Sequence, residues 1–159
     1  MTQATQVFGT TLCTAKAGLA AGTTTTYTRA ADVEGSIGGK FATPLSSGSN
    51  TASPTTDYNG DAFTAQAAST VCVYVYSIVA AGTIAVHQGS VETMDVDAVV
   101  VASSFPSIDL ETYLPFGYVV IQNGSTGSAW TIGTSNWTAT GVLDTFTDVT
   151  VLPSRPQSA

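Results

Sequence analysis

"TVCVYVYSIV", residues 70–79, decides the fold, because β-branched and aromatic residues favour strands and fill this stretch almost without a break. Successive side chains of a strand point to opposite faces, so the residues of this stretch fall into two sets, one on each face. Both sets are apolar or aromatic, and a strand with two such faces is covered on both sides. One set is Val71, Val73 and Val75, and the other is Cys72, Tyr74, Tyr76 and Ile78.

The segments on either side extend this strand into a sheet. Residues 80–82 form a tight turn into a second strand at 83–89, which predicts a hairpin. No long window has the three-four spacing of an amphipathic helix. Residues 127–133 are expected to pair back on 117–123 through an Asn-Gly turn at 123–124. Further strands are predicted at 23–30, 35–43 (broken by glycines), 97–103 and 142–152, and a long polar loop at 43–63.

Short strands at this spacing predict an all-β domain. The 159 residues have the length of one domain, and we expect a β-sandwich or a jelly-roll-like small barrel of about seven to nine strands. Residues 1–22, with their small side chains, are predicted to form an N-terminal arm. Residues 153–159 carry two prolines and are predicted to form an extended C-terminal tail.

The charge content limits the partners of the protein. Charged residues make up only 9% of the chain, against roughly 25% in typical soluble domains. A surface of threonine and serine suits an extracellular or virion all-β protein, or a subunit that is covered by neighbours. With 4 basic and 11 acidic residues, the chain lacks the basic cluster that nucleic acid or an anionic membrane surface requires.

Targeting signals and cysteine usage point to the cytosol. The first residues lack a basic segment followed by an apolar run, so we expect no secretion signal. No apolar stretch approaches the roughly 20 residues of a membrane span. Two cysteines, Cys13 and Cys72, do not make a disulfide framework. We expect both to be free thiols, although a disulfide between them stays open.

Candidate catalytic groups are few. His87 is the only histidine, no Gly-x-Ser-x-Gly elbow is present, and a lone histidine at a strand end is more often structural. The segment with Glu92, Asp95 and Asp97 lacks the glycine and the bidentate glutamate of a calcium-binding loop. We interpret these carboxylates as the charged edge of a strand, where they discourage pairing with another sheet. The loop pairs Asp57/Asp61 and Asp109/Glu111 could act as acid and base only if the fold converged them. We therefore expect no catalytic residue, metal or cofactor, and no enzyme.

Six aromatic residues lie in or beside the predicted strands. A tryptophan- and tyrosine-rich surface can bind sugars or form a protein interface, so these residues are the candidate interface. The alternative is that at least half of them fill the core. They are Tyr74, Tyr76, Phe116, Tyr118, Trp130 and Trp137.

Several segments together resemble a group of virion structural proteins of tailed bacteriophages. The shared pattern is a Phe-Gly-Tyr strand (116–118), a Gly-Ser turn (124–125), Gly-Thr-Ser-Asn (133–136) and Gly-Val (141–142). The resemblance extends over residues 17–28, 73–89, 115–142 and 148–157.

The resemblance implies a protein of the virion and supplies no catalytic residues. Our leading hypothesis is a capsid decoration (cement) protein, assembled in the host cytoplasm and bound to the outer capsid surface. Its expected partners are the major capsid protein and further copies of itself, with a trimer favoured. The alternative is a receptor-binding or fibre-head domain that recognises host surface glycans.

Overall fold

The computed structural model describes residues 10–94 and 104–156, and within those ranges it contains strands and no helix. The all-β prediction is confirmed, but the described residues form eleven strands rather than about seven to nine. Short strands at 12–13, 19–21 and 48–52 lie in segments that were expected to be an arm or a loop, and the predicted strand at 35–43 is two strands. The strands are β1 (Leu12–Cys13), β2 (Leu19–Ala21), β3 (Thr26–Arg29), β4 (Gly35–Ile37), β5 (Lys40–Phe41), β6 (Gly48–Ala52), β7 (Thr70–Val79), β8 (Ile84–Gln88), β9 (Glu92–Thr93), β10 (Tyr113–Asn123) and β11 (Val142–Asp148).

The largest sheet has the order β11-β10-β7-β8, with β9 pairing with β7 beyond the end of β8. Its centre is the antiparallel pair β7–β10, which runs from Thr70↔Asn123 to Val79↔Tyr113. The register shifts between Pro115 and Gly117, where proline has no N–H to donate to the ladder. The predicted hairpin at 70–89 is confirmed as β7–β8.

The alternation predicted for β7 is present in the structure. Cys72, Tyr74, Tyr76 and Ile78 belong to one buried core cluster. Val71, Val73 and Val75 belong to a second cluster. Both faces of the strand are therefore covered, as its composition predicts.

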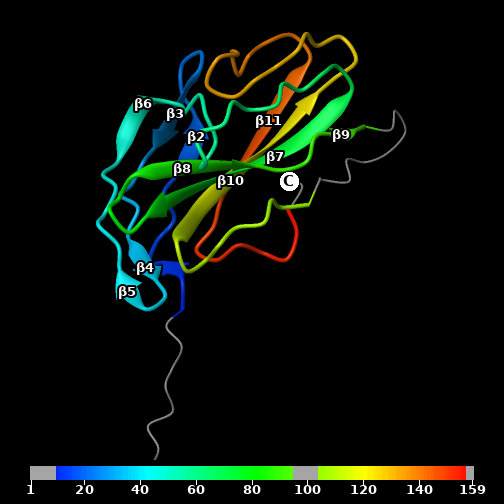
Figure 1. The fold of residues 1–159 in the computed structure, drawn as a ribbon. Helices are drawn as coiled ribbons and strands as arrows, with labels where there is room; N and C mark the ends of the chain where they lie inside the picture. Colours follow the sequence, from blue (N-terminus) through cyan, green and yellow to red (C-terminus); the bar gives the residue numbers. More distant parts are fainter. Residues whose placement is uncertain (1–9, 95–103, 157–159) are drawn as a thin grey trace, which may run out of the picture.

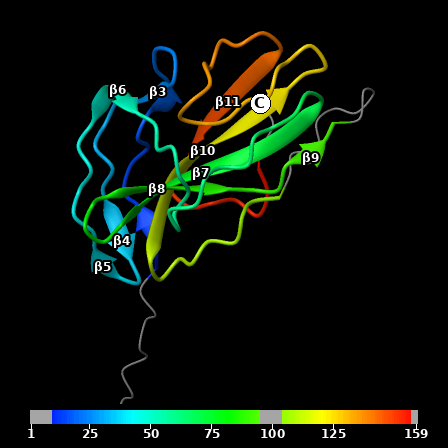
Figure 2. The same cartoon turned by 45° about the horizontal axis from the view of Figure 1, so that its top comes forward.

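Two three-stranded sheets pack beside the large sheet, and all three sheets contribute to the first core cluster. The β2-β3-β6 sheet places Tyr27 against Tyr76, with ring centroids 5.2 Å apart. In the β1-β4-β5 sheet, β1 and β4 contact β10. Figures 1 and 2 show β3 and β6 towards one end of the molecule and β4 and β5 towards the other, an arrangement consistent with a small β-sandwich.

The second face of the large sheet is covered by segments without regular secondary structure. Met94, Phe105 and Ile108 pack there from the chain around the connection between β9 and β10. Val149 and Leu152 pack there from the chain after β11. Residues 153–156 of the expected tail form no strand, and Pro156 is buried.

Three of the predictions differ from the structure. The arm expected at 1–22 is wrong from residue 12 onward, because β1 pairs with β4 and β2 pairs with β3. The loop expected at 43–63 contains β6, which pairs with β3. Residues 127–133 form no strand. The partner of β10 is instead β11, with Asn123 opposite Val142, which places the predicted strand 142–152 at the edge of the sheet.

The predicted strand at 97–103 lies outside the described residues. Within the described ranges, no helix is long and apolar enough to cross a membrane.

Candidate functional site

The six aromatic residues of the candidate interface lie in the protein core. Their side chains are at most 2% exposed, so the interpretation of them as a surface for sugars or neighbouring subunits is wrong. The physical reason is the covering of both sheet faces. Trp130 and Trp137 pack on each other at 5.4 Å and donate their indole N–H groups to the carbonyls of Asn136 and Thr26.

His87 and Ser77 form a buried polar pair. The Ser77 hydroxyl lies 2.8 Å from His87 Nε2, on adjacent strands β7 and β8. The imidazole stacks on Tyr58 at 4.4 Å and meets the edge of Tyr113 at 4.6 Å. Burial lowers the pKa of His87 to about 4, and the Asp57 carboxylate opposes that shift.

A serine–histidine contact is the nucleophile–base arrangement of many hydrolases. Here both side chains are 0% exposed, so no substrate can reach the hydroxyl in this conformation. The pair therefore acts as a hydrogen bond between two strands, which is the structural role that the sequence favours for His87.

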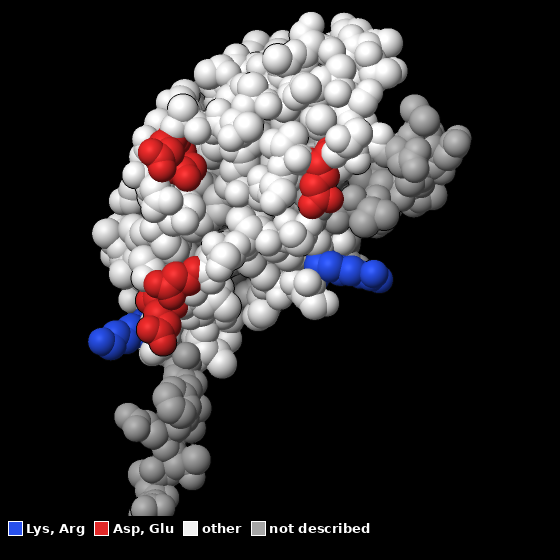
Figure 3. Space-filling view, turned by 45° about the vertical axis from the view of Figure 1, so that its right-hand side comes forward, with Lys and Arg blue, Asp and Glu red and all other residues white. Residues whose placement is uncertain are grey.

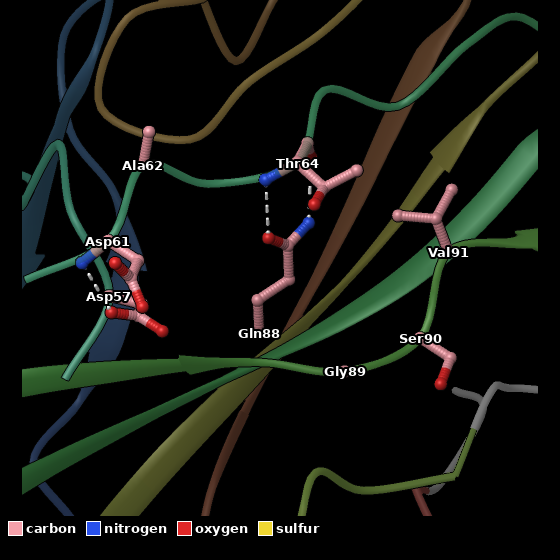
Figure 4. Close-up of a pocket in the computed structure, with 8 residues that line it drawn as sticks. All are labelled: Asp57, Asp61, Ala62, Thr64, Gln88, Gly89, Ser90 and Val91. Carbon is pink, nitrogen blue, oxygen red and sulfur yellow. Dashed lines mark hydrogen bonds between the residues drawn. The ribbon is translucent and has the colours of Figure 1, made fainter. Parts of the chain in front are cut away.

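A polar hollow of about 510 Å³ lies beside the 57–64 loop (Figure 4). It brings Asp57 and Asp61 together, the pair that the sequence places in one loop. The Asp57 carboxylate accepts hydrogen bonds from the backbone N–H groups of Asn59 and Asp61, at 2.8 and 2.9 Å. The lining residues are Asp57, Asp61, Ala62, Thr64, Gln88, Gly89, Ser90 and Val91.

The far wall of the hollow is fixed by Gln88. Its side-chain amide donates to the Thr64 carbonyl at 2.7 Å and accepts from the Thr64 N–H at 2.8 Å. Among the described residues, no three histidine, cysteine, aspartate or glutamate side chains are placed to hold a metal ion. The hollow thus offers hydroxyl and carboxylate groups to a polar ligand.

Glu92, Asp109 and Glu111 are not among the residues that line the hollow. Glu92 is exposed on β9, and Asp95 and Asp97 lie outside the described residues. Asp109 accepts hydrogen bonds from the Thr112 hydroxyl at 2.6 Å and the Glu111 N–H at 2.9 Å, in the turn before β10. These hydrogen bonds lower the pKa of the Asp109 carboxyl.

The two cysteines are separate free thiols, as the sequence predicts. Cys13 is 2% exposed and Cys72 is 0% exposed. Burial raises the pKa of each thiol to about 11. Thiols that are neutral and covered are poor nucleophiles, so neither is a reactive site.

The exposed apolar side chains indicate a different binding surface. Phe41 is 88% exposed at the tip of the β4–β5 hairpin. Leu110 is 46% exposed in the turn before β10. We call residues 10–13, 34–41 and 109–112 the hairpin end.

Hydrogen bonds join the three segments of the hairpin end. The Thr11 hydroxyl donates to the Leu110 carbonyl at 2.6 Å and accepts from the Gly38 N–H at 2.9 Å. The Ser36 hydroxyl donates to the Thr10 carbonyl at 2.8 Å. The exposed side chains of Phe41 and Leu110 therefore belong to segments that hydrogen bonds connect.

Phe41 is not among the candidate interface residues expected from the sequence, although the sequence carries a signal for it. Gly38 and Gly39 both have positive φ, 55° and 81°, as a two-residue hairpin turn requires. Such a turn pairs Ile37 with Lys40 and Ser36 with Phe41. Because cross-strand partners share a face, Phe41 lies on the side of Ser36, away from the buried Ile37.

No protein-family model, no curated protein and no solved structure matches this chain.

Proposed function

We propose that this protein is a virion structural protein of a tailed bacteriophage, which decorates the outer capsid surface and stabilises it through subunit contacts. The sequence resemblance supports this proposal, as does an all-β fold whose potential nucleophile is sealed in the core. The low charge content also supports it, because a surface rich in threonine and serine is easily covered by neighbours.

The observation that carries the proposal is the exposed apolar side chain at the hairpin end. Single exposed hydrophobic residues are ordinary on protein surfaces. Phe41 is different because its ring is almost entirely exposed beside a two-glycine turn, in one hydrogen-bonded unit with the exposed Leu110. A phenylalanine held outwards in this way is typical of an interface anchor.

The test is binding to capsids of the parent phage that lack this protein. Purified protein should cosediment with expanded capsids in a fixed ratio, and decorated capsids should withstand a higher temperature before they rupture. A particle reconstruction should then place the chain on the outer shell. Failure of the wild-type protein to bind, or density for it in the tail alone, contradicts the proposal.

The alternative function, recognition of host glycans, now depends on the polar hollow. The tryptophans that would have stacked on sugar rings are buried, so they cannot form a sugar-binding platform in this structure. Asp57, Asp61 and Ser90 could still accept or donate hydrogen bonds to sugar hydroxyls. Specific binding on a glycan array that is lost in Asp57→Asn and Asp61→Asn would favour this function over decoration.

A further inference from the structure

We infer that the hairpin end docks, with Phe41 as its anchor, into an apolar socket bordered by lysine or arginine on a different protein of the particle. The inference rests on the proposed function and adds to it the docking surface and the chemistry of the partner.

The outer face of the β1-β4-β5 sheet supplies the apolar contact. Leu12 is opposite Ser36, and Ser36 is opposite Phe41, so the three side chains form one row on the same face. The other face, with Cys13 and Ile37, is buried against the core. The row therefore lies on the outer face, where Leu12 and Ser36 are partly exposed and the Phe41 ring is 88% exposed.

The backbone beneath this row is closely packed at Gly35 on β4, the strand that pairs with β5 and its Phe41. A Cβ added at Gly35 would lie 2.3 Å from the Leu12 carbonyl and 2.7 Å from the Leu114 side chain. β1 and β4 thus approach each other, and the core, more closely than any other residue would allow. A pre-organised anchor loses little conformational freedom on binding.

Charge around the row defines the partner. The exposed carboxylates of Glu34, Asp109 and Glu111 lie on the hairpin end, against the single cation of Lys40. Figure 3 shows carboxylates gathered beside one cation at the lower end of the molecule, and two further acidic patches and a second cation elsewhere on the same face. Complementary potential requires lysine or arginine at the rim of the partner's socket.

A second copy of this chain does not fit that description. The whole sequence has 4 lysine and arginine residues and a net charge of −7. Arg29 is 5% exposed, and Lys40 lies on the hairpin end itself. The other two cations, Lys16 and Arg155, are exposed single charges on a chain with 11 acidic residues. Contact between two hairpin ends would bring carboxylates together, and the rest of the chain offers only these two exposed cations for the rim of a socket. A different protein therefore fits better than a second copy.

The experiment measures binding of the full chain to expanded capsids that lack it, with matched variants. Phe41→Ala should weaken binding about tenfold to a hundredfold, because full burial of such a ring contributes that much. Leu143→Ala removes a 56% exposed leucine on β11 and should change binding by less than about twofold. Both variants should unfold at the wild-type temperature, since neither side chain belongs to the core.

A second pair of variants tests the contribution of charge to binding. Glu111→Lys and Glu92→Lys make the same charge change at two exposed glutamates, one on the hairpin end and one on β9. Glu111→Lys should weaken binding severalfold at low salt and flatten its salt dependence, whereas Glu92→Lys should resemble the wild type.

The outcomes separate the two proposals. Wild-type binding that Phe41→Ala and Glu111→Lys leave unchanged overturns this inference and leaves decoration standing. Absence of wild-type binding rejects decoration and the inference together. Association of purified protein into oligomers that Phe41→Ala dissolves would show that the hairpin end binds a second copy, which also overturns the inference.

Discussion

Tyr74 and Tyr76 point to the same face of β7, but only Tyr74 has a hydroxyl with hydrogen-bond partners. The Tyr74 hydroxyl accepts from the side-chain amide of Gln88 at 3.2 Å and from that of Gln66 at 3.5 Å. The Tyr76 hydroxyl is fully buried, and its polar neighbour, the Ser53 hydroxyl, lies outside hydrogen-bond geometry and is itself without a partner. Two neighbouring tyrosines of equal burial therefore differ in what their oxygens contribute to stability.

This difference predicts opposite effects of removing the two hydroxyls. Tyr74→Phe should destabilise the protein by about 1–2 kcal/mol, because it leaves a buried amide without its acceptor. Tyr76→Phe should be neutral or slightly stabilising, because an unpaired buried hydroxyl carries a desolvation penalty. Urea unfolding at pH 7 measures both, and a larger loss for Tyr76→Phe than for Tyr74→Phe would show that the Tyr76 hydroxyl is bonded after all.

His87 makes stability depend on pH. Its pKa is lowered from 6.5 to about 4 by burial, so protonation favours the unfolded chain. The contribution of the neutral imidazole is complete above pH 6.5 and is lost as the pH falls towards 4, by about 1.4 kcal/mol per pH unit for one proton.

The control for this prediction is His87→Gln, which keeps a side chain able to hydrogen-bond Ser77 and removes the titration. Unfolding free energies of both proteins are compared from pH 7 to pH 4, because carboxylates also titrate at the acid end. The difference between the two curves should have the slope given above. Parallel curves would mean that folding does not lower the pKa of His87.

The central strands were predictable because their signal is local. The composition of residues 70–79 fixes a strand with two apolar faces, and the structure places Tyr74 and Val75 in different core clusters as the alternation requires. The pairing of 127–133 was not predictable, because it depends on a side chain. Asn123 continues β10, and its amide binds the surrounding loops instead of initiating a tight hairpin.

The location of the candidate binding surface was harder to predict than the fold. Aromatic residues in strands are equally compatible with a core and with an interface, since both bury apolar surface. Trp130 and Trp137 are distinguished from surface residues only by the tertiary fold, which satisfies their indole N–H groups with backbone carbonyls. Phe41, in contrast, could have been placed on the outside from the register of the Gly38-Gly39 turn, once the apolar Ile37 is assigned to the core.

The buried thiols predict slow modification of the native protein. Cys13 and Cys72 are covered, and the pKa of each is raised to about 11, so the thiolate fraction at pH 8 is small. A disulfide-exchange reagent should label neither thiol within minutes in buffer and both in denaturant. Rapid labelling of native protein, or the absence of two thiols after unfolding, would contradict the structure.

Substitution of Asn123 is expected to reduce the free energy of unfolding more than substitution of any other polar residue of the protein. Its amide Nδ2 donates to the carbonyls of Gln66, Ala67 and Ser128, at 3.1, 3.0 and 2.8 Å. Asn123→Ala leaves these carbonyls without their donor and should cost about 2–4 kcal/mol. Asn59→Ala, an exposed position in the 57–61 loop, is the control and should change stability by less than about 0.5 kcal/mol.

A carboxylate at position 123 makes the test more specific. Asn123→Asp places a buried charge against carbonyl oxygens, so its pKa should be raised and its stability should increase as the pH falls and the acid becomes a donor. Wild-type stability should decrease over the same range because of His87. The variant keeps His87, so its own gain offsets that loss, and the difference in unfolding temperature between the two proteins should narrow from pH 7 to pH 5. A parallel decrease of both proteins would place the Asn123 side chain outside the network of carbonyls.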